Sequence, residues 1–210
     1  ISHELKTPIA VLVSNFEKME SEKDPEKLGR LIQVQKENTK SLSKIITSLL
    51  EIAKAESGAA PAQSRVRIDE LIFDLLDEFK SIQPDFQFSL DYSEVVDNEN
   101  QLTILANDRL VKAAFSNLMQ NCIQYSRDKK ANIAISAGTS NLKVDFTNHG
   151  KILNSREQQF LFQHFFRGEN AKGKSGFGLG LVFINKIFTY YGGQVSYYTN
   201  GTDLNTFSVS

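Results

Sequence analysis

The feature that most constrains this chain is helical apolar spacing, which runs through residues 1–57 and is broken at one point. Apolar side chains recur every three or four positions on both sides of the break, as is typical of helices that bury one face. At the break the chain turns polar between Ser21 and Pro25, and Pro25 suits the first turn of a helix capped by Asp24. The sequence therefore predicts a helical hairpin.

The second helix of this hairpin has more apolar surface than one hairpin can bury. Its heptad seam is interrupted by Gln35 and Asn38. Pairing two copies into a four-helix bundle would bury this surface, which predicts a homodimer. Packing of the hairpin against the downstream part of the chain is the alternative. The apolar positions are Leu28, Leu31, Ile32, Leu42, Ile45, Ile46, Leu49, Leu50, Ile52 and Ala53.

The beginning of the first helix combines reactive side chains with a proline. His3 and Thr7 stand four positions apart on one helical face, and Glu4 adjoins the histidine. Pro8 removes a backbone hydrogen bond and crowds the carbonyl of Glu4, which costs a helix interior about 3 kcal/mol. A neutral imidazole is a competent nucleophile near neutral pH, and a carboxylate can orient it. His3 is therefore a candidate nucleophile, with an ordinary solvated histidine as the alternative.

A different pattern follows residue 57. Small residues at 58–64 predict a linker, and residues 65–210 then interleave strand and helix patterns without a regular βαβ rhythm. We expect an α+β chain in which the hairpin is followed by an α/β sandwich, with helices covering one face of a mixed sheet. Strands are predicted over 66–68, 86–90, 102–106, 133–137, 142–146, 194–198 and 206–209, and helices over 69–81, 108–125 and 178–191, with Asp69 and Asn107–Asp108 as caps.

Composition narrows the function classes. The formal net charge of −1 gives no electrostatic case for binding nucleic acid or an anionic membrane. The one cysteine, Cys122, excludes an internal disulfide, and its apolar helical setting predicts a buried structural thiol. No apolar run approaches the length of a membrane span. The chain lacks a start methionine and stops within a predicted strand, so we expect a fragment of a longer protein.

Polar side chains gather on the helix predicted over 108–125. Asn117 and Asn121 stand four positions apart on one face, and Tyr125 follows one turn later. Neutral amide oxygens suit Mg²⁺, which keeps waters and takes other oxygens from substrate phosphates. A plain polar surface is the alternative for the asparagines, and a core position is the alternative for Tyr125.

Glycines precede the helix predicted over 178–191. Gly176, Gly178 and Gly180 would let backbone amides approach phosphate oxygens closely, next to a helix N-terminus that favours negative charge. Simple loop flexibility would explain the same glycines. The connection over 151–176 is long enough to be a functional lid. Before it, a turn at 148–150 could bring backbone close to a ligand.

Together these segments resemble the catalytic core of a bacterial sensor histidine kinase. Five motifs occur in the family's order over nearly the whole chain, and the first of them is highly specific. The H box is Ser2-His3-Glu4-Leu5-Lys6-Thr7-Pro8, the N box spans 117–126, the first glycine box is Asn148-His149-Gly150, the F box spans 160–167, and the second glycine box spans 176–180.

The resemblance implies a phosphotransfer hairpin over 1–57 and an ATP-binding domain over 65–210, of the fold shared with gyrase and Hsp90. His3 would take the γ-phosphoryl group from ATP, and Glu4 would orient the imidazole and act as base. Thr7 matches the position that holds a water for the reverse, phosphatase reaction. Arg167 would stabilise charge on the transferring phosphate.

The resemblance also implies the nucleotide contacts. Asn121 would bind Mg²⁺ with support from Asn117, and Tyr125 would lie against adenine. Asn148 stands where the family has an aspartate that recognises the adenine amino group, and Gly150 follows it. The glycines of the second glycine box, Gly176, Gly178 and Gly180, would approach the phosphates.

Three positions depart from the family pattern. Asn148 replaces an aspartate, Ile152 replaces a glycine, and Gln124 replaces a phosphate-contacting lysine. A neutral amide should bind the adenine amine more weakly than a carboxylate does. Lys172 and Lys174 in the lid would compensate if they reached the nucleotide, but we expect them to be solvated.

The function expected from these features is autophosphorylation on His3 with ATP and Mg²⁺, followed by transfer to an aspartate on a response-regulator receiver domain. The resemblance implies a cytoplasmic fragment of a membrane-anchored sensor. One alternative is a degenerate scaffold that dimerises and binds partners without useful turnover. Another is an ATPase or serine kinase of the same nucleotide fold, but that reading leaves the hairpin and its histidine unused.

Overall fold

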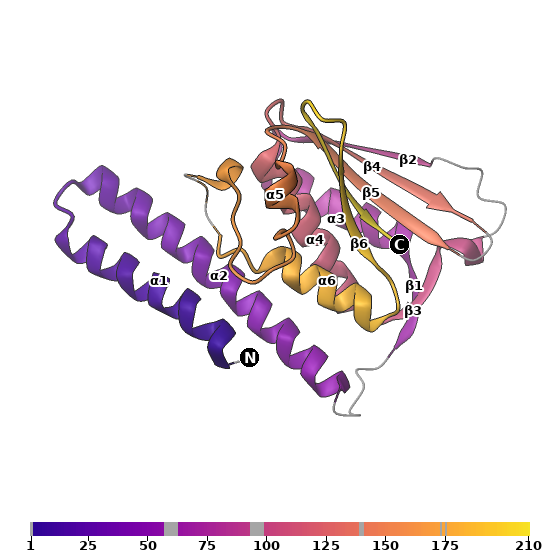
Figure 1. The fold of residues 1–210 in the computed structure, drawn as a ribbon, viewed down its shortest axis with the longest axis horizontal. Helices are drawn as coiled ribbons and strands as arrows, with labels where there is room; N and C mark the ends of the chain where they lie inside the picture. The colour runs from indigo at the N-terminus through magenta and orange to yellow at the C-terminus, as the bar shows by residue number, and fades with distance from the viewer. Residues whose placement is uncertain (1, 57–62, 93–98, 139–140, 173, 175) are drawn as a thin grey trace.

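The computed structural model describes residues 2–56, 63–92, 99–138, 141–172, 174 and 176–210; within the hairpin, the side chains of 2–8, 41, 44–45 and 48–56 lie outside the description. The predicted hairpin is confirmed: α1 (Ser2–Ser21) and α2 (Pro25–Glu56) run antiparallel, side by side (Figure 1). Asp24 caps α2, since its Oδ1 accepts hydrogen bonds from the backbone nitrogens of Glu26 (3.0 Å) and Lys27 (3.4 Å).

The two polar residues that interrupt the apolar seam of α2 are buried against α1. Gln35 donates through Nε2 to the carbonyl oxygen of Leu12 (3.0 Å) and accepts from Nδ2 of Asn15 (3.0 Å). Asn38 is also buried. A buried amide must find hydrogen-bond partners, so the paired bonds of Gln35 fix how the two helices align along their length.

Two sheets follow the hairpin. The larger has the strand order β2-β4-β5-β7-β6, in which β2 pairs parallel with β4 and every other pair is antiparallel. The predicted mixed sheet is therefore confirmed. A separate two-stranded antiparallel sheet joins β1 to β3. The strands are β1 (Ser64–Arg67), β2 (Gln87–Tyr92), β3 (Thr103–Ala106), β4 (Lys130–Ala137), β5 (Leu142–His149), β6 (Val195–Thr199) and β7 (Leu204–Val209).

Helices pack on one face of the larger sheet (Figure 1). The core between the layers is centred on Phe115 of α4, whose ring centroid lies 5.4 Å from that of Phe146 on β5 and 5.6 Å from that of Phe188 on α6. The helices after the hairpin are α3 (Ile68–Ile82), α4 (Asp108–Tyr125), the short α5 (Ser155–Gln158) and α6 (Gly180–Tyr190), with 3-10 turns η1 (Glu99–Leu102) and η2 (Glu169–Ala171).

Of the two predicted helix caps in this domain, one is confirmed and one is wrong. Asn107 caps α4, since its Oδ1 accepts from the backbone nitrogen of Leu110 (3.2 Å). Asp69 lies inside the first turn of α3, which begins at Ile68. Its buried carboxylate instead accepts from Nε (2.9 Å) and Nη2 (2.7 Å) of Arg67, and these bonds hold the pKa of Asp69 below its ordinary value. The competing ion pair explains the error.

Cys122 on α4 is buried, as predicted. Burial raises the pKa of its thiol to about 12, so the group stays neutral at ordinary pH. Within the described helices, no segment is both long enough and apolar enough to cross a bilayer.

Candidate functional site

The second half of α4 carries two of the predicted nucleotide-site amides. Asn117 donates through Nδ2 to the carbonyl oxygen of Ala113 (2.9 Å), which fixes the orientation of its amide. Its Oδ1 faces the start of α6, because a Cβ placed on Gly180 would lie 3.5 Å from this oxygen. Asn121, one turn on, is half-buried, and its side chain makes no hydrogen bond with any described residue. The helix therefore presents amide oxygens near the second glycine box.

These amides fit Mg²⁺ only as part of a larger set of ligands. Within the described ranges, no group of three or more histidine, cysteine, aspartate or glutamate side chains is placed to hold a metal ion. Mg²⁺ needs six oxygen ligands, so one or two amides can serve it only if waters and phosphates supply the others. This donor set fits an ion that arrives with a nucleotide.

Asn148, at the end of β5, lies on the helix-facing side of the sheet with Phe146 and is 3% exposed. Its Nδ2 is buried and has no hydrogen-bond partner among the described residues. The turn after β5 packs against the end of α4, because a Cβ on Gly150 would collide with the carbonyl oxygen of Tyr125. The structure therefore brings together Asn148, Gly150 and Tyr125 from two separate elements, as the sequence predicted only by resemblance.

The loop between β6 and β7 holds this turn in place. The backbone nitrogen of Gly150 donates to the carbonyl oxygen of Asp203 (2.7 Å), and Asn205 donates through Nδ2 to the carbonyl oxygen of Gly150 (3.3 Å). The Asp203 carboxylate also contacts His149 Nδ1 (3.3 Å) and Arg127 Nη2 (2.5 Å). The turn at 148–150 is thus held by Asp203 and Asn205, two residues to which the sequence analysis assigned no role.

Phe165 and Gly178 join the F box to the second glycine box. The backbone nitrogen of Phe165 donates to the carbonyl oxygen of Gly178 (3.1 Å), and a Cβ on Gly178 would lie 2.5 Å from the carbonyl oxygen of Phe166. Both residues have left-handed backbones, with φ of 64° and 69°. A side chain at position 178 would be excluded by this approach, so glycine is required there for packing as well as for conformation.

Arg167 organises the lid. Its guanidinium donates to the carbonyl oxygens of Gly176 (2.8 Å), Ala171 (2.8 Å) and Lys174 (2.5 Å). Because three backbone carbonyls of the lid bind this one guanidinium, the side chain links separate parts of the lid to one another. Its predicted contact with a transferring phosphate stays a prediction.

Lys174 is a site residue that the sequence analysis undervalued. Its ammonium donates to the carbonyl oxygen of Gln124 and lies 4.3 Å from the ring centroid of Tyr125. Desolvation lowers the pKa of this lysine. The expectation of a solvated lysine is therefore wrong for Lys174. It holds for Lys172, which is exposed and lies 3.8 Å from Glu169. Gln124 stands where the family has a phosphate-contacting lysine. This departure was the signal in the sequence that a cation from another part of the chain would be needed to contact phosphate.

The hairpin contacts the lid through a small apolar cluster. Leu42 of α2 is buried against Phe177 and Leu179, which flank Gly178, while Phe165 and Leu12 pack at the margin of the cluster. The downstream domain thus covers part of the hairpin's apolar surface, and α2 runs beside α6 (Figure 1).

The phospho-acceptor end of the hairpin is described as backbone only. His3, Glu4 and Thr7 belong to α1, and His3 and Thr7 stand one helical turn apart, as predicted. The side chains of these three residues lie outside the described part of the structure. Their chemical roles therefore stay predictions.

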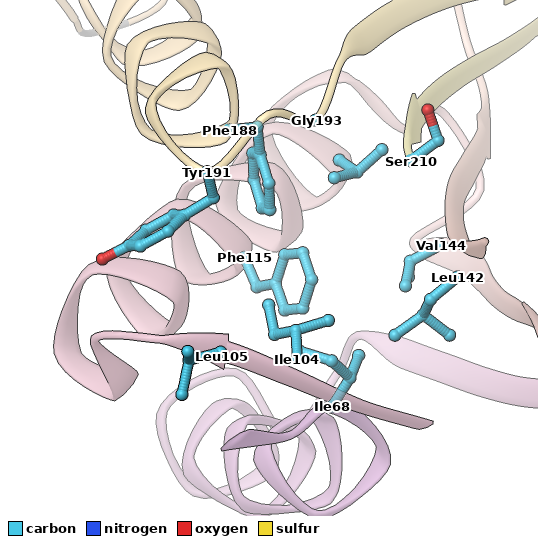
Figure 2. A pocket seen from close by; sticks show the side chains of 11 residues that line it. Ile68, Ile104, Leu105, Phe115, Leu142, Val144, Phe188, Tyr191, Gly193 and Ser210 are labelled. Atoms are coloured by element: carbon cyan, nitrogen blue, oxygen red, sulfur yellow. The ribbon is translucent and has the colours of Figure 1, made fainter. Parts of the chain in front are cut away.

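A hollow lies between α4, α6 and the start of β5 (Figure 2). It is a cavity of ≈ 400 Å³ with a mainly apolar lining. Leu142 and Val144, from the start of β5, line it, whereas Asn148 stands at the far end of the same strand. The Tyr191 hydroxyl in its wall accepts a hydrogen bond from the backbone nitrogen of Asn107 (2.9 Å). This cavity does not belong to the nucleotide site.

Two family models match the chain in succession. The His Kinase A (phospho-acceptor) domain matches residues 1–58, and the histidine kinase-, DNA gyrase B- and HSP90-like ATPase matches residues 106–209. The signal transduction histidine-protein kinase ArlS of Staphylococcus haemolyticus is 26% identical over an alignment 214 positions long, which covers 99% of this chain and 46% of that protein. ArlS of Staphylococcus aureus strain USA300 is 26% identical over 92% of this chain and 43% of its own length.

Solved structures agree on the fold. The Acinetobacter baumannii histidine kinase AdeS superposes with a TM-score of 0.66 at 19% identity, over 99% of this chain and 97% of that chain. Histidine kinase ThkA, solved in complex with the response regulator protein TrrA, gives a TM-score of 0.68 at 20% identity, over 99% of this chain and 59% of that chain.

A phospho-acceptor hairpin followed by a kinase-type ATPase sandwich defines the class, and the chain belongs to the bacterial sensor histidine kinases, of which it is a catalytic core. It spans less than half the length of the curated ArlS relatives that it matches.

Proposed function

We propose that this core is an ATP-dependent protein-histidine kinase that phosphorylates itself on His3 and passes the phosphoryl group to an aspartate of a response-regulator receiver domain. The observation that carries the proposal is the packing of Leu42, on the hairpin that bears His3, against Phe177 and Leu179 of the glycine-rich loop. Nucleotide site and acceptor hairpin are thereby parts of one assembly. The ThkA–TrrA complex supports a receiver domain as the partner.

Different residues of this site would contact the base, the phosphates and Mg²⁺. Tyr125 would lie against the base, and Asn148 would hydrogen-bond its edge, because its buried Nδ2 lacks any other described partner. Lys174, already beside Tyr125, would turn to the phosphates and supply the charge absent at Gln124. Asn121, supported by Asn117, would hold Mg²⁺, which neutralises phosphate charge when bound.

The transfer itself needs a nucleophile, a base and charge stabilisation. Glu4 would accept a hydrogen bond from one imidazole nitrogen of His3, which leaves the other nitrogen free to attack the γ-phosphorus. The N–P bond forms as the bond from that phosphorus to the ADP oxygen breaks, and the imidazole proton passes to Glu4. Arg167, whose guanidinium donates to the carbonyl oxygen of Gly176 in the lid, would stabilise the charge on the transferring phosphoryl group.

A homodimer would complete the hairpin. Ile9, Val13 and Phe16 form an exposed apolar stripe on α1, and Ile32 of α2 is exposed as well. A second copy would cover this surface in a four-helix bundle. We also propose that the core belongs to a membrane-anchored sensor, a view supported by the description of its longer relatives as signal transduction kinases.

The degenerate scaffold is the less favoured alternative. Asn148, Ile152 and Gln124 depart from the family pattern, but two structural features offset these changes. Asn148 keeps a free hydrogen-bonding group at the base position, and Lys174 brings a cation to Gln124.

Incubation of the purified chain with labelled ATP and Mg²⁺ tests the proposal. The label should be acid-labile and base-stable, and His3→Ala should abolish it. His164→Ala is the matched control, because His164 is exposed on the lid and should keep the label. Label that persists in His3→Ala would show that the acceptor lies elsewhere.

A further inference from the structure

Asn148 carries a hydrogen-bonding capacity that the fold does not use. Its side chain is 3% exposed, and Nδ2 finds no partner within the described part of the chain. Buried polar groups in folded proteins are almost always paired, and an unpaired one marks a place where a ligand or water belongs. The amide is therefore available to an acceptor supplied by a water or by a ligand.

The cross-strand neighbours of Asn148 do not fill this need. Asn205 stands directly opposite on β7, but its Oδ1 accepts from the Tyr197 hydroxyl (2.6 Å) and its Nδ2 donates to the carbonyl oxygen of Gly150 (3.3 Å). On the other side, β4 places Ala131 opposite, which has no polar side chain. Neither cross-strand neighbour accepts a hydrogen bond from Nδ2 of Asn148 in this structure.

Gly150 lets the turn after β5 pack closely against the end of α4, directly beside this amide. A Cβ on that residue would lie 3.3 Å from Nδ2 of Asn148 and would collide with the carbonyl oxygen of Tyr125. Asn148 and Tyr125 are thus neighbours through Gly150, and the amide lies beside the residue that we propose to hold the base.

We propose that Asn148 lets this site accept 6-oxopurine nucleotides, such as inosine triphosphate, as well as ATP. The inference rests on the proposed function, because it takes the base to lie against Asn148. A carboxamide has one donor group and one acceptor, and a half-turn of the amide exchanges them. Oδ1 can accept from the 6-amino group of adenine while Nδ2 donates to N1. After the half-turn, Nδ2 donates to a 6-oxo group while Oδ1 accepts from N1–H.

A carboxylate at this position would discriminate where the amide does not. It has acceptors only, so where one of its oxygens contacts position 6 alone, it pairs with a 6-amino group and faces a 6-oxo group without a proton between the oxygens. Sites built on such a mismatch reject the wrong partner strongly, because buried groups are left unpaired. Asn148 removes this rejection. The γ-phosphoryl group of inosine triphosphate would then pass to His3, leaving inosine diphosphate, with the same balance of atoms as for ATP.

Calorimetric titration of the chain with ATP and with inosine triphosphate tests the proposal. Inosine triphosphate differs from ATP only at position 6 and in the N1 proton, and it avoids the 2-amino group of GTP. The two affinities should agree within about tenfold, since each base finds a donor and an acceptor on the same amide. A preference for ATP larger than about tenfold overturns the proposal.

Substitutions sharpen the result. Asn148→Asp should raise the preference for ATP by about 100-fold. Asn148→Ala should weaken the binding of both nucleotides alike. It takes the place of Asn148→Asp in the test if the buried carboxylate prevents folding. Asn107→Asp is the matched control, because aspartate also caps a helix and position 107 caps α4 away from the base. A preference that Asn148→Asp leaves unchanged, or an alanine variant that loses ATP alone, counts against the assignment.

The same experiment separates this inference from the kinase proposal. ATP that binds and labels His3, with inosine triphosphate excluded, overturns the base assignment alone. Both nucleotides bound without label on His3 overturns the kinase proposal alone. Binding of neither nucleotide overturns both.

Discussion

Lys174 places its ammonium 4.3 Å from the ring centroid of Tyr125, so a cation from the lid covers the aromatic ring at the end of α4. Its hydrogen bond to the carbonyl oxygen of Gln124 fixes it there. The lid and the N box are therefore in contact through one side chain, at the position where a nucleotide is expected to enter.

Replacement of Lys174 should separate phosphate binding from base binding. Lys174→Met keeps the aliphatic stem and removes the charge, so ATP affinity should fall about tenfold while adenosine affinity is unchanged or slightly raised. Lys172→Met is the control, since Lys172 lies in the same loop and is exposed. Parallel loss of ATP and adenosine would mean that Lys174 acts on the base through Tyr125.

Truncation of Leu42 should loosen the lid without unfolding the sandwich. Leu42→Ala removes buried contacts with Phe177 and Leu179, so amide hydrogen exchange over 176–183 should rise about tenfold. Exchange in β4 and β5 should not change. Ile32→Ala is the matched control, because Ile32 is exposed on the same helix. Unchanged exchange over 176–183 would show that the cluster contributes little to holding the lid.

Charge placed on the exposed stripe of α1 should prevent dimer formation. Val13→Asp combined with Phe16→Asp should give a monomer by sedimentation, with ATP affinity retained. Ile82→Asp adds a charge at an even more exposed apolar position on α3 and should leave the oligomeric state as it was. A wild-type chain that stays monomeric at high concentration would exclude this interface.

Thr7 should matter for the reverse reaction. A hydroxyl one helical turn after His3 can hold the water that attacks an aspartyl phosphate on the regulator. Thr7→Ala should lose most phosphatase activity and keep most autophosphorylation, and Thr7→Ser should restore the former. If both activities fall together, the substitution acts on the helix near Pro8 instead.

Asp69 gives a pH dependence with a defined sign. The hydrogen bonds from Arg67 hold the pKa of Asp69 below its ordinary value of 3.8, so its stabilising contribution is complete above that value and is lost as the pH falls through the lowered pKa. Asp69→Asn should lower the free energy of unfolding by about 1–3 kcal/mol near neutral pH and flatten the acid limb. Denaturant titration from pH 2 to 7 measures both effects.

Glu70→Gln is the control for this series. Glu70 is exposed and lies 3.7 Å from the same arginine, so its loss should cost less than about 1 kcal/mol. Equal effects of the two substitutions would contradict the assignment of the stabilisation to the buried pair.

Local pattern was enough to predict most elements. Helical spacing and the Asp24 cap gave the hairpin, and the Asn107 cap gave the start of α4. The prediction of Asp69 as a cap was wrong because Arg67, two residues earlier, offers a buried carboxylate a stronger partner than backbone nitrogens do.

The candidate site was only partly predictable, because its parts meet across the fold. Sequence alone determined which residues can do chemistry: an imidazole beside a carboxylate at His3, helical amides at Asn117 and Asn121, and glycines that admit phosphate. Tertiary structure decided that Lys174 lies over Tyr125, that Arg167 binds lid carbonyls, and that Asn148 keeps an unpaired donor. These relationships depend on strand order and loop packing between residues far apart in the chain. The spacing of residues along one element predicts neither strand order nor loop packing, since it describes only neighbours within a few turns.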